Sequence, residues 1–179
     1  MDRRTFTIAL AAWPFCAQAQ KGTRTMKDID AMQKNWKNFL AAGAPAVSPD
    51  EKLKLSDDEW RKRLSNEQFA VLRQESTERA GSSPFNNEKR QGMFACAGCA
   101  LPLFKSETKY ESGTGWPSFY DFIPGSLGTK TDFHLVLPRT EYHCIRCGGH
   151  HGHVFDDGPA PTHQRWCNNG VSLRFIPKA

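Results

Sequence analysis

The sequence predicts a mainly β fold, with two small antiparallel sheets in a single domain preceded by short N-terminal helices. From Gly92 onward, short apolar or aromatic runs alternate with glycine and proline, which is typical of short antiparallel strands joined by turns. Before Gly92, two helix-start signals follow each other closely. Two Cys-x-x-Cys pairs stand far apart in the chain, where a shared metal ion could join distant hairpins of a small core.

The two helix-start signals are capping boxes, in which a serine and a Glu or Gln three residues later satisfy the first free backbone N–H groups. Ser56 with Glu59 predicts a helix through Leu64, and Ser65 with Gln68 predicts a second helix. The second helix has an apolar face made of Phe69, Val71 and Leu72. We expect both helices to cover a sheet and to take no part in chemistry.

The strands are expected at the apolar runs over residues 93–96, 116–122, 133–137, 153–155 and 171–175. Turn signals separate these runs at Gly125, Gly128, Pro138 and residues 157–159. Because the runs are short and the turns frequent, antiparallel pairing is expected.

The first residues have the pattern of a cleavable export signal. Arg3 and Arg4 precede an apolar run over residues 7–15, and Ala17 and Ala19 are the small residues that a signal peptidase reads. The apolar run is too short to span a bilayer. A frayed N-terminal helix is the alternative.

This pattern divides the chain into a signal peptide over residues 1–19, a linker or extension over 20–54 and a folded domain over 55–177. The arginine pair resembles a twin-arginine signal. We therefore expect an exported protein of a bacterial periplasm.

The composition gives few hints of partners. The chain has 179 residues and a formal net charge of +5, and its basic residues are scattered rather than clustered, so no nucleic-acid partner is expected. No apolar run reaches the roughly 18 residues of a membrane span, so no membrane attachment is expected after signal cleavage. Nothing in the pattern indicates an obligate partner subunit, and we expect a monomer.

Four of the six cysteines form two knuckles, Cys96 with Cys99 and Cys144 with Cys147. A two-residue spacer lets both sulfurs of a tight turn face one metal ion, and two such turns complete a tetrahedron of thiolates. Gly98, and Gly148 with Gly149, fit the tight backbone of such turns. The pattern predicts one structural zinc per chain. Two disulfides in an oxidising compartment, or a thioredoxin-like redox pair, are the alternatives.

The remaining cysteine of the folded domain is Cys167, since Cys16 lies in the expected signal peptide. Residues 150–159 are dense in histidine and carboxylate side chains, and Arg165 lies two residues before Cys167. Nearby arginine and histidine lower the pKa of a thiol, and an imidazole can protonate a leaving oxygen. These groups indicate an activated-cysteine enzyme. An inert cysteine, with the histidines as a surface tract or a second metal site, is the alternative.

Two segments carry a resemblance to a known family. Residues 150–159 read His-x-x-His-Val-Phe-x-Asp-Gly-Pro and are followed by Arg165-x-Cys167-x-Asn169, while residues 109–119 read Lys-Tyr-Glu-Ser-Gly-Thr-Gly-Trp-Pro-Ser-Phe. Together with the two knuckles, which flank the second segment, these strings resemble the zinc-containing methionine-R-sulfoxide reductases of the MsrB type.

The resemblance implies an oxidoreductase, a peptide-methionine (R)-S-oxide reductase, that repairs methionine sulfoxide in oxidised exported proteins and also reduces the free amino acid. Cys167 matches the nucleophile that attacks the sulfoxide sulfur and becomes a sulfenic acid. Trp116 matches the aromatic wall that receives the substrate's methyl group. The matching active-site histidines are His150 and His153, and the matching polar residues are Asp157, Arg165 and Asn169.

Thr114 departs from the family pattern, because many relatives carry a cysteine there that resolves the sulfenic acid as a disulfide. With Cys16 removed and four cysteines on zinc, Cys167 has no partner thiol. We therefore expect an external, thioredoxin-like thiol to regenerate it. Regeneration by Cys16, if the signal peptide is retained, is the alternative. His151 is a second departure, since relatives commonly have leucine there, and a third histidine could invite adventitious metal.

Two other functions stay open at this stage. A zinc-stapled binding module without catalysis would not need Cys167 together with histidine, arginine and asparagine. A thiol enzyme that handles a small aldehyde adduct would not need the Gly-Trp-Pro-Ser-Phe segment at residues 115–119.

Overall fold

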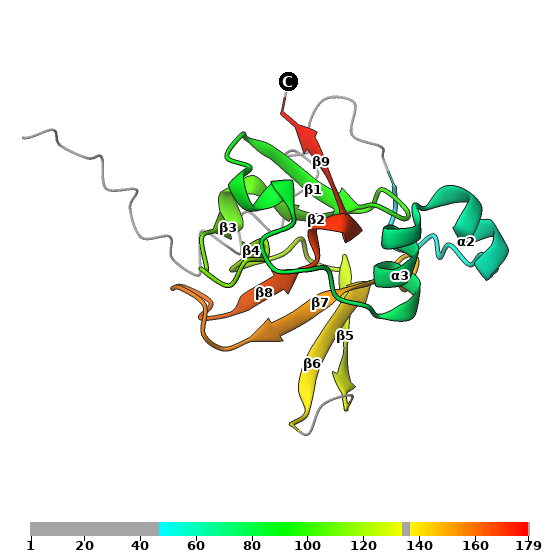
Figure 1. The fold of residues 1–179 in the computed structure, drawn as a ribbon. Coiled ribbons are helices and arrows are strands. Elements are labelled where there is room, and N and C mark those ends of the chain that lie inside the picture. Colours follow the sequence, from blue (N-terminus) through cyan, green and yellow to red (C-terminus); the bar gives the residue numbers. More distant parts are fainter. Residues whose placement is uncertain (1–46, 134–136, 179) are drawn as a thin grey trace, which may run out of the picture.

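A computed structural model of the chain describes residues 47–133 and 137–178. The expected signal peptide, Cys16 and most of the expected linker lie outside the described residues. The described residues form a mainly β fold with two antiparallel sheets and two α-helices (Figure 1), which confirms the predicted fold class.

Both predicted helices form at their capping boxes. Helix α2 spans Asp57–Arg63 and helix α3 spans Asn66–Gln74. In each, the serine before the helix accepts a hydrogen bond from a backbone N–H three residues later, and the Glu or Gln there accepts one from the serine N–H. The apolar residues of α3 are buried as expected. The helix ends at Glu75, whose left-handed backbone (φ 57°) turns the chain away.

The smaller sheet has the strand order β2-β1-β9. Its strands are β2 (Pro102–Lys105), β1 (Gly92–Cys96) and β9 (Leu173–Pro177). Short 3-10 helices lie outside the sheets: η2 (Pro84–Asn87), η3 (Ser106–Thr108) and η4 (Gly170–Ser172). Helix α3 packs against η4 and the larger sheet.

The larger sheet has six strands in the order β3-β4-β8-β7-β6-β5. They are β3 (Lys109–Tyr110), β4 (Ser118–Phe119), β8 (Arg165–Asn168), β7 (His150–Phe155), β6 (Arg139–Cys144) and β5 (Leu127–Asp132). Strand β5 lies at an edge, and Figure 1 shows the β5–β6 hairpin extending away from the helices and the smaller sheet.

Aromatic side chains from both sheets make up much of the core. Phe104 of β2 stacks on Phe119 of β4 with ring centroids 4.2 Å apart, and Phe94 of β1 meets the same Phe119 ring edge-on. All three rings are fully buried. Burial of such large apolar surfaces holds the two sheets together.

The prediction of a strand over residues 133–137 is wrong, because neither its first nor its last residue lies in a strand. Strand β5 ends at Asp132 and β6 begins at Arg139, and Phe133 and Leu137 lie outside both strands with 74% and 76% of their surface exposed. Residues 134–136 lie outside the described residues. The prediction placed a strand on the apolar run and missed β5, because β5 is a largely polar edge strand in which apolar residues do not alternate with polar ones.

Gly128, expected in a turn, lies inside β5. A Cβ at this position would lie 2.7 Å from His143 Nε2, so the glycine makes room for that ring. The predicted run 116–122 forms only the two-residue strand β4.

The end of the expected linker contacts the domain. The backbone N–H of Leu53 donates to the carbonyl of Arg146 at 2.8 Å, and Lys52 Nζ donates to the carbonyl of Ile145 at 2.8 Å. The domain boundary at residue 55 stays a prediction.

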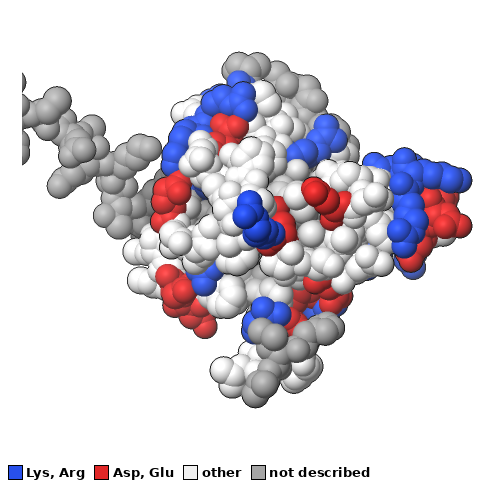
Figure 2. All heavy atoms as spheres, viewed as in Figure 1, with Lys and Arg blue, Asp and Glu red and all other residues white. Residues whose placement is uncertain are grey.

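Charged side chains of both signs share the face shown in Figure 2, where they gather together over α2. That helix has acidic residues in its first turn and basic residues in its last. These charges are opposite in sign to the helix dipole at each end, which stabilises the helix. Among the described residues, no helix is long and apolar enough to cross a membrane.

Candidate active site and metal centre

One residue from each strand of the larger sheet lies in a single row across it. The register pairs Cys167 with Ser118 on one side and with His153 on the other, and His153 with Glu141. The ends of the row are Tyr110 and Lys130. Directly opposed residues of antiparallel strands project from the same face of the sheet. Strand pairing therefore brings thiol, imidazole, carboxylate and hydroxyl groups together from distant parts of the sequence.

A β-bulge explains how both predicted histidines face this row. His150 and His153 are three residues apart, and a regular strand would place them on opposite faces. The pairing shifts between Tyr142 and His143, so that β7 contains one extra residue against β6. The extra residue returns His150 to the face of His153, and the two rings meet with centroids 5.6 Å apart.

His151, the extra residue, points into the protein interior. Its ring is fully buried, and Nδ1 lies 2.9 Å from the Ser172 hydroxyl. Burial lowers the pKa of His151 to about 3, so the ring is neutral at physiological pH. Within the described residues His151 belongs to no metal-ligand cluster, and the idea that it could invite a metal gains no support.

Cys167 lies in a hollow of about 120 Å³. Four of the predicted site residues line it together, namely Trp116, His153, Cys167 and Asn169. The other lining residues are Thr77, Arg139, Gly152, Phe155 and Asn168. His150, Asp157 and Arg165 lie around this hollow rather than in its wall. The roles assigned to all of these residues stay predictions.

The pKa of Cys167 corrects one expectation from the sequence. Burial raises the pKa of this thiol above its ordinary value, although the charge of Arg165 and a hydrogen bond from Thr114 both oppose the rise. The predicted lowering is therefore wrong for the protein without substrate, because desolvation of the thiolate outweighs the attraction of the guanidinium. The sulfur is predominantly a thiol at neutral pH.

Each histidine is held by a carboxylate that the sequence did not point to. His150 Nδ1 lies 2.7 Å from Glu141 Oε1, and both side chains are almost completely buried. Burial works to raise the pKa of Glu141, but the hydrogen bond and charge of His150, with Lys130, lower it overall. His150 Nε2 is buried and has no hydrogen-bond partner among the described residues.

The second carboxylate is that of Asp132. Its Oδ2 lies 2.7 Å from His153 Nε2 and accepts a hydrogen bond from Arg139 Nη2 at 2.6 Å. Burial lowers the pKa of His153, and the hydrogen bond to Asp132 partly opposes this. Asp132 therefore orients the imidazole beside Cys167 and favours its protonated form.

Arg165 and Asp157 form a two-pronged pair at the edge of the site. The guanidinium Nε and Nη2 donate to the two carboxylate oxygens at 2.8 Å and 2.9 Å. The guanidinium also lies 4.2 Å from the Phe155 ring centroid, a cation–π distance. Asp157 thus holds Arg165 in place near Cys167.

Trp116 and Asn169 are both attached to Glu78. Trp116 Nε1 donates to the Glu78 carbonyl at 3.2 Å, and Asn169 Oδ1 accepts from the Glu78 N–H at 3.0 Å. The Glu78 carboxylate accepts from the backbone N–H groups of Gly170 and Val171. The Asn169 amide also donates to the carbonyl of His151 at 3.0 Å. With both ends of its amide occupied, Asn169 positions the backbone around Cys167.

Thr114, which stands where many relatives have a cysteine, belongs to a chain of hydroxyl groups. Its Oγ1 lies 2.8 Å from Ser112 Oγ, and Ser118 Oγ donates to Ser112 at 2.8 Å. The hydrogen bond from Thr114 favours the thiolate of Cys167. In this chain the residue at this position is a hydrogen-bond partner of Cys167.

Sequence patterns missed Asp132, Glu141, Arg139, Thr77 and Glu78. The first three lie on the β5–β6 hairpin, whose register depends on pairing that no local pattern shows. Thr77 and Glu78 lie in an irregular segment after α3, where a single polar residue carries no spacing signal.

The two Cys-x-x-Cys knuckles meet as predicted. Their four cysteines are buried, and the ligand atoms lie within 4.8 Å of one another. Across the knuckles, Cys96 Sγ lies 3.6 Å from Cys147 Sγ, and Cys99 Sγ lies 3.5 Å from Cys144 Sγ. Sulfurs bound to one zinc at about 2.3 Å stand about 3.8 Å apart at the corners of a tetrahedron. The four thiols are free, so the alternative of two disulfides is not supported.

Both knuckles have the same backbone. In the first, Cys96 donates its N–H to Leu101 and accepts from Ala100; in the second, Cys144 donates to Gly149 and accepts from Gly148. Ala100 (φ 62°) and Gly148 (φ 69°) take the left-handed conformation that closes each turn. Gly98, expected to serve this purpose, does not have a positive φ. The donor set and its spacing fit a structural zinc ion, which these four thiolates would hold.

Comparison with known proteins agrees with this geometry. The SelR domain family matches residues 64–177. A peptide methionine sulfoxide reductase MsrB of Methanosarcina barkeri is 52% identical over 121 residues, which cover 67% of this chain and 85% of that protein. An MsrB of Agrobacterium fabrum is 45% identical over 127 residues, covering 70% of this chain and 94% of that protein.

The chloroplastic peptide methionine sulfoxide reductase B1 of Oryza sativa subsp. japonica is 47% identical over 128 residues, which cover 71% of this chain and 60% of that longer protein. The matched region contains both knuckles, Trp116, both histidines and Cys167. The chain therefore belongs to the SelR domain family, the family of the MsrB-type peptide methionine sulfoxide reductases.

Proposed function

We propose that this protein reduces the R epimer of methionine sulfoxide to methionine through a sulfenic acid on Cys167. Membership of the family supports the broader statement that it is an oxidoreductase acting on methionine sulfoxide. The observation that carries the finer proposal is that Cys167, His153 and Trp116 line one small hollow. That hollow presents a nucleophile, a proton donor and an apolar wall to the same small group.

Trp116 is expected to receive the methyl group of the sulfoxide. Its indole nitrogen is already bonded to the Glu78 carbonyl, so the indole ring is fixed in place. An indole face offers apolar area to a methyl group while the polar S–O bond turns toward the imidazole side. The two faces of the hollow differ in polarity, and this difference supports selection of one epimer.

The chemical step transfers one oxygen atom. The Cys167 sulfur attacks the sulfoxide sulfur, and His153 gives a proton to the sulfoxide oxygen. The oxygen then bonds to the cysteine sulfur while the substrate S–O bond and the newly formed S–S bond break. Methionine is released as the two-electron reduced product, and Cys167 becomes the two-electron oxidised sulfenic acid. Because burial raises the pKa of the free thiol, the thiol proton must leave as substrate binds. His153, which lies opposite Cys167 and lines the same hollow, is placed to take this proton and pass it to the sulfoxide oxygen.

An external thiol then restores Cys167. One thiol displaces the sulfenic hydroxyl as water and forms a mixed disulfide, and a second thiol releases Cys167 and leaves as a disulfide. The four knuckle cysteines are buried on the metal site, so none is placed to serve. A thioredoxin-like protein fits this role as the reductant.

The zinc ion is proposed to be structural, because four thiolates leave no position for substrate. The export signal, the periplasmic location and the monomeric state are proposed from the sequence. They accord with a role in repairing oxidised exported proteins.

Resolved R and S epimers of N-acetylmethionine sulfoxide, with dithiothreitol as the reductant, test the proposal. We expect turnover of the R epimer alone, and a loss of at least about a thousandfold in Cys167→Ser, which removes the nucleophile. Equal turnover of both epimers, or a Cys167→Ser protein as active as the wild type, would refute it. A non-catalytic zinc module would turn over neither epimer.

A further inference from the structure

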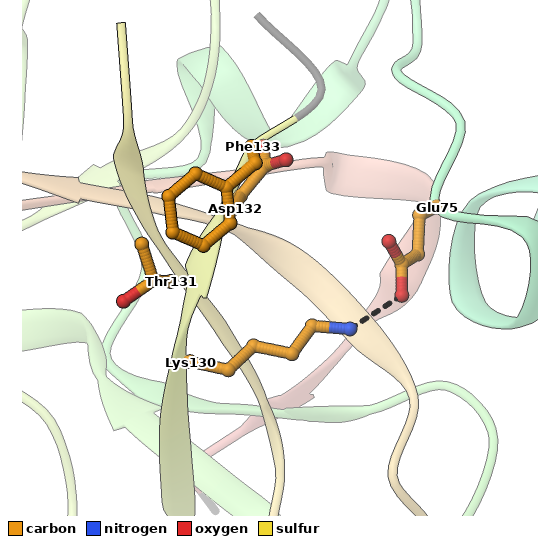
Figure 3. Close-up of a pocket in the computed structure, with 5 residues that line it drawn as sticks. All are labelled: Glu75, Lys130, Thr131, Asp132 and Phe133. Atoms are coloured by element: carbon orange, nitrogen blue, oxygen red, sulfur yellow. Dashed lines mark hydrogen bonds and ion pairs between the residues drawn. The ribbon is translucent and has the colours of Figure 1, made fainter.

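A second hollow of about 350 Å³ lies beside the Cys167 site. Residues 130–133 of the β5–β6 hairpin form one side of it, and Glu75, at the end of α3, forms the other. Figure 3 shows Lys130 reaching from the hairpin to Glu75, with Thr131 and Phe133 on the same hairpin segment. Lys130 Nζ and Glu75 Oε1 are 2.6 Å apart. We call this space the hairpin hollow.

Asp132 forms a shared wall between the hairpin hollow and the Cys167 site. The residue lines the hairpin hollow, while its carboxylate partners His153 and Arg139 both line the hollow that contains Cys167. On the other side of the hairpin hollow, the chain runs from Glu75 to Thr77, which lines the Cys167 hollow. The two hollows therefore adjoin at Asp132, and a chain that leaves the Cys167 hollow on this side would meet the hairpin hollow next.

Because the Cys167 hollow is small, the rest of a polypeptide substrate must lie outside it. Its volume of about 120 Å³ suits the end of a single side chain. The backbone and neighbouring residues of a protein substrate must therefore lie on the surface around it. Successive residues of an extended chain are about 3.3 Å apart, so the residues next to methionine sulfoxide reach only the immediate surroundings.

The hairpin hollow offers these residues an apolar contact. Phe133 lines it with 74% of its surface exposed, and it is one of two large apolar side chains with such exposure among the described residues. The second, Leu137, is 76% exposed but does not line the hollow. An exposed phenyl ring gains free energy when another apolar group covers it.

We propose that the hairpin hollow is a subsite for an apolar residue adjacent to methionine sulfoxide in a polypeptide substrate. The inference rests on the proposed function and adds a sequence preference to it. Phe133 supplies the apolar contact, and the Lys130–Glu75 pair supplies charged groups to the polar backbone of the substrate.

Three substrates test the subsite: free methionine-R-sulfoxide, a peptide with this residue between two leucines, and the same peptide with two glycines. For the wild type, kcat/KM is expected to be about five- to tenfold higher for the leucine peptide than for the glycine peptide. Phe133→Ser should remove this difference and leave kcat/KM for free methionine-R-sulfoxide unchanged. Phe133→Leu should keep most of the difference, because it keeps the apolar surface.

Leu137→Ser is the matched control, because Leu137 is equally exposed on the same hairpin but lies outside the hollow. It should retain the leucine preference. Equal rates on the two peptides in the wild type, or an equal loss in Leu137→Ser and Phe133→Ser, would overturn the subsite. Absence of wild-type activity on all three substrates would instead refute the proposed function.

Discussion

His150 and His151 are neighbours in the chain, but they face opposite sides of the sheet and have different chemistry. His150 shares the Cys167 face and is held by Glu141, whereas His151 is buried in the interior beside Ser172. The bulge in β7 decides this separation. A histidine string in a sequence therefore does not show which rings reach a site until the register of the strand is known.

The buried His151 predicts a loss of stability in acid. Burial lowers the pKa of His151 in the folded protein from its ordinary value of 6.5 to about 3. The unfolded chain therefore binds a proton that the folded protein excludes as the pH falls from about 6.5 toward 3, and the free energy of unfolding decreases over that range. At pH 5 this single group should cost about 2 kcal/mol relative to pH 7.

Replacing this residue by an apolar one should remove the effect. We expect His151→Leu to lose less free energy of unfolding between pH 7 and pH 5 than the wild type does, as measured by urea denaturation. Surface histidine His163 supplies the control, and His163→Leu should show the wild-type slope. An unchanged slope in His151→Leu would mean that the ring is protonated or exposed in the folded protein.

Local sequence strings predicted four residues that line the Cys167 hollow, because each string places several functional side chains close together in the chain. They are Trp116, His153, Cys167 and Asn169. Asp132 and Glu141 were missed for a physical reason. They orient the two histidines through pairing between strands, and such pairing depends on a register that is absent from any local pattern.

At the scale of elements, β7 and β8 approach each other very closely beside Cys167. A Cβ on Gly152 would lie only 1.9 Å from the Cys167 carbonyl oxygen. Gly152 also lines the Cys167 hollow. The glycine therefore permits the close strand contact that places His153 opposite Cys167.

Gly152→Ala is expected to force the two strands apart. Overpacking of this kind costs about 1–3 kcal/mol in the free energy of unfolding, and kcat/KM should fall because Cys167 moves relative to His153. Gly98→Ala is the matched control, since its new Cβ would stand at ordinary contact distances of 3.5–3.7 Å. Equal stability of the two variants in urea denaturation would contradict the claim that β7 and β8 leave no room for a Cβ at Gly152.

The sequence located the two α-helices but not the edge strand β5. Both α-helices could be located because a capping box is a local signal that acts through adjacent backbone groups. The edge strand β5 could not, because its polar sequence resembles a loop and its strand structure comes from pairing with β6.

At the scale of the whole molecule, the metal site joins the two sheets. Cys96 is the last residue of β1 in the smaller sheet, and Cys144 is the last residue of β6 in the larger one. Arg73 of α3 also donates to the carbonyl of Cys147 at 2.9 Å. A zinc ion held by all four thiolates would therefore connect α3 and both sheets through one centre.

We expect about one zinc per chain by elemental analysis, and loss of the metal in Cys99→Ser. Because metal binding in such sites contributes directly to folding, Cys99→Ser should unfold at a temperature well below that of the wild type. Cys167→Ser, which alters a cysteine outside the cluster, should keep the zinc and the thermal stability. Two disulfides and no metal in the purified protein would contradict this account.

The most direct test of the central claim is the mass of the protein after one turnover with the R epimer in the absence of any reductant. We predict a gain of one oxygen atom, located on Cys167 as a sulfenic acid. Thr114→Cys, which restores a thiol beside Cys167, should show a disulfide between the two positions in place of the added oxygen. An unchanged mass after methionine has formed, or an intramolecular disulfide in the wild type, would contradict a nucleophile that works without a partner thiol.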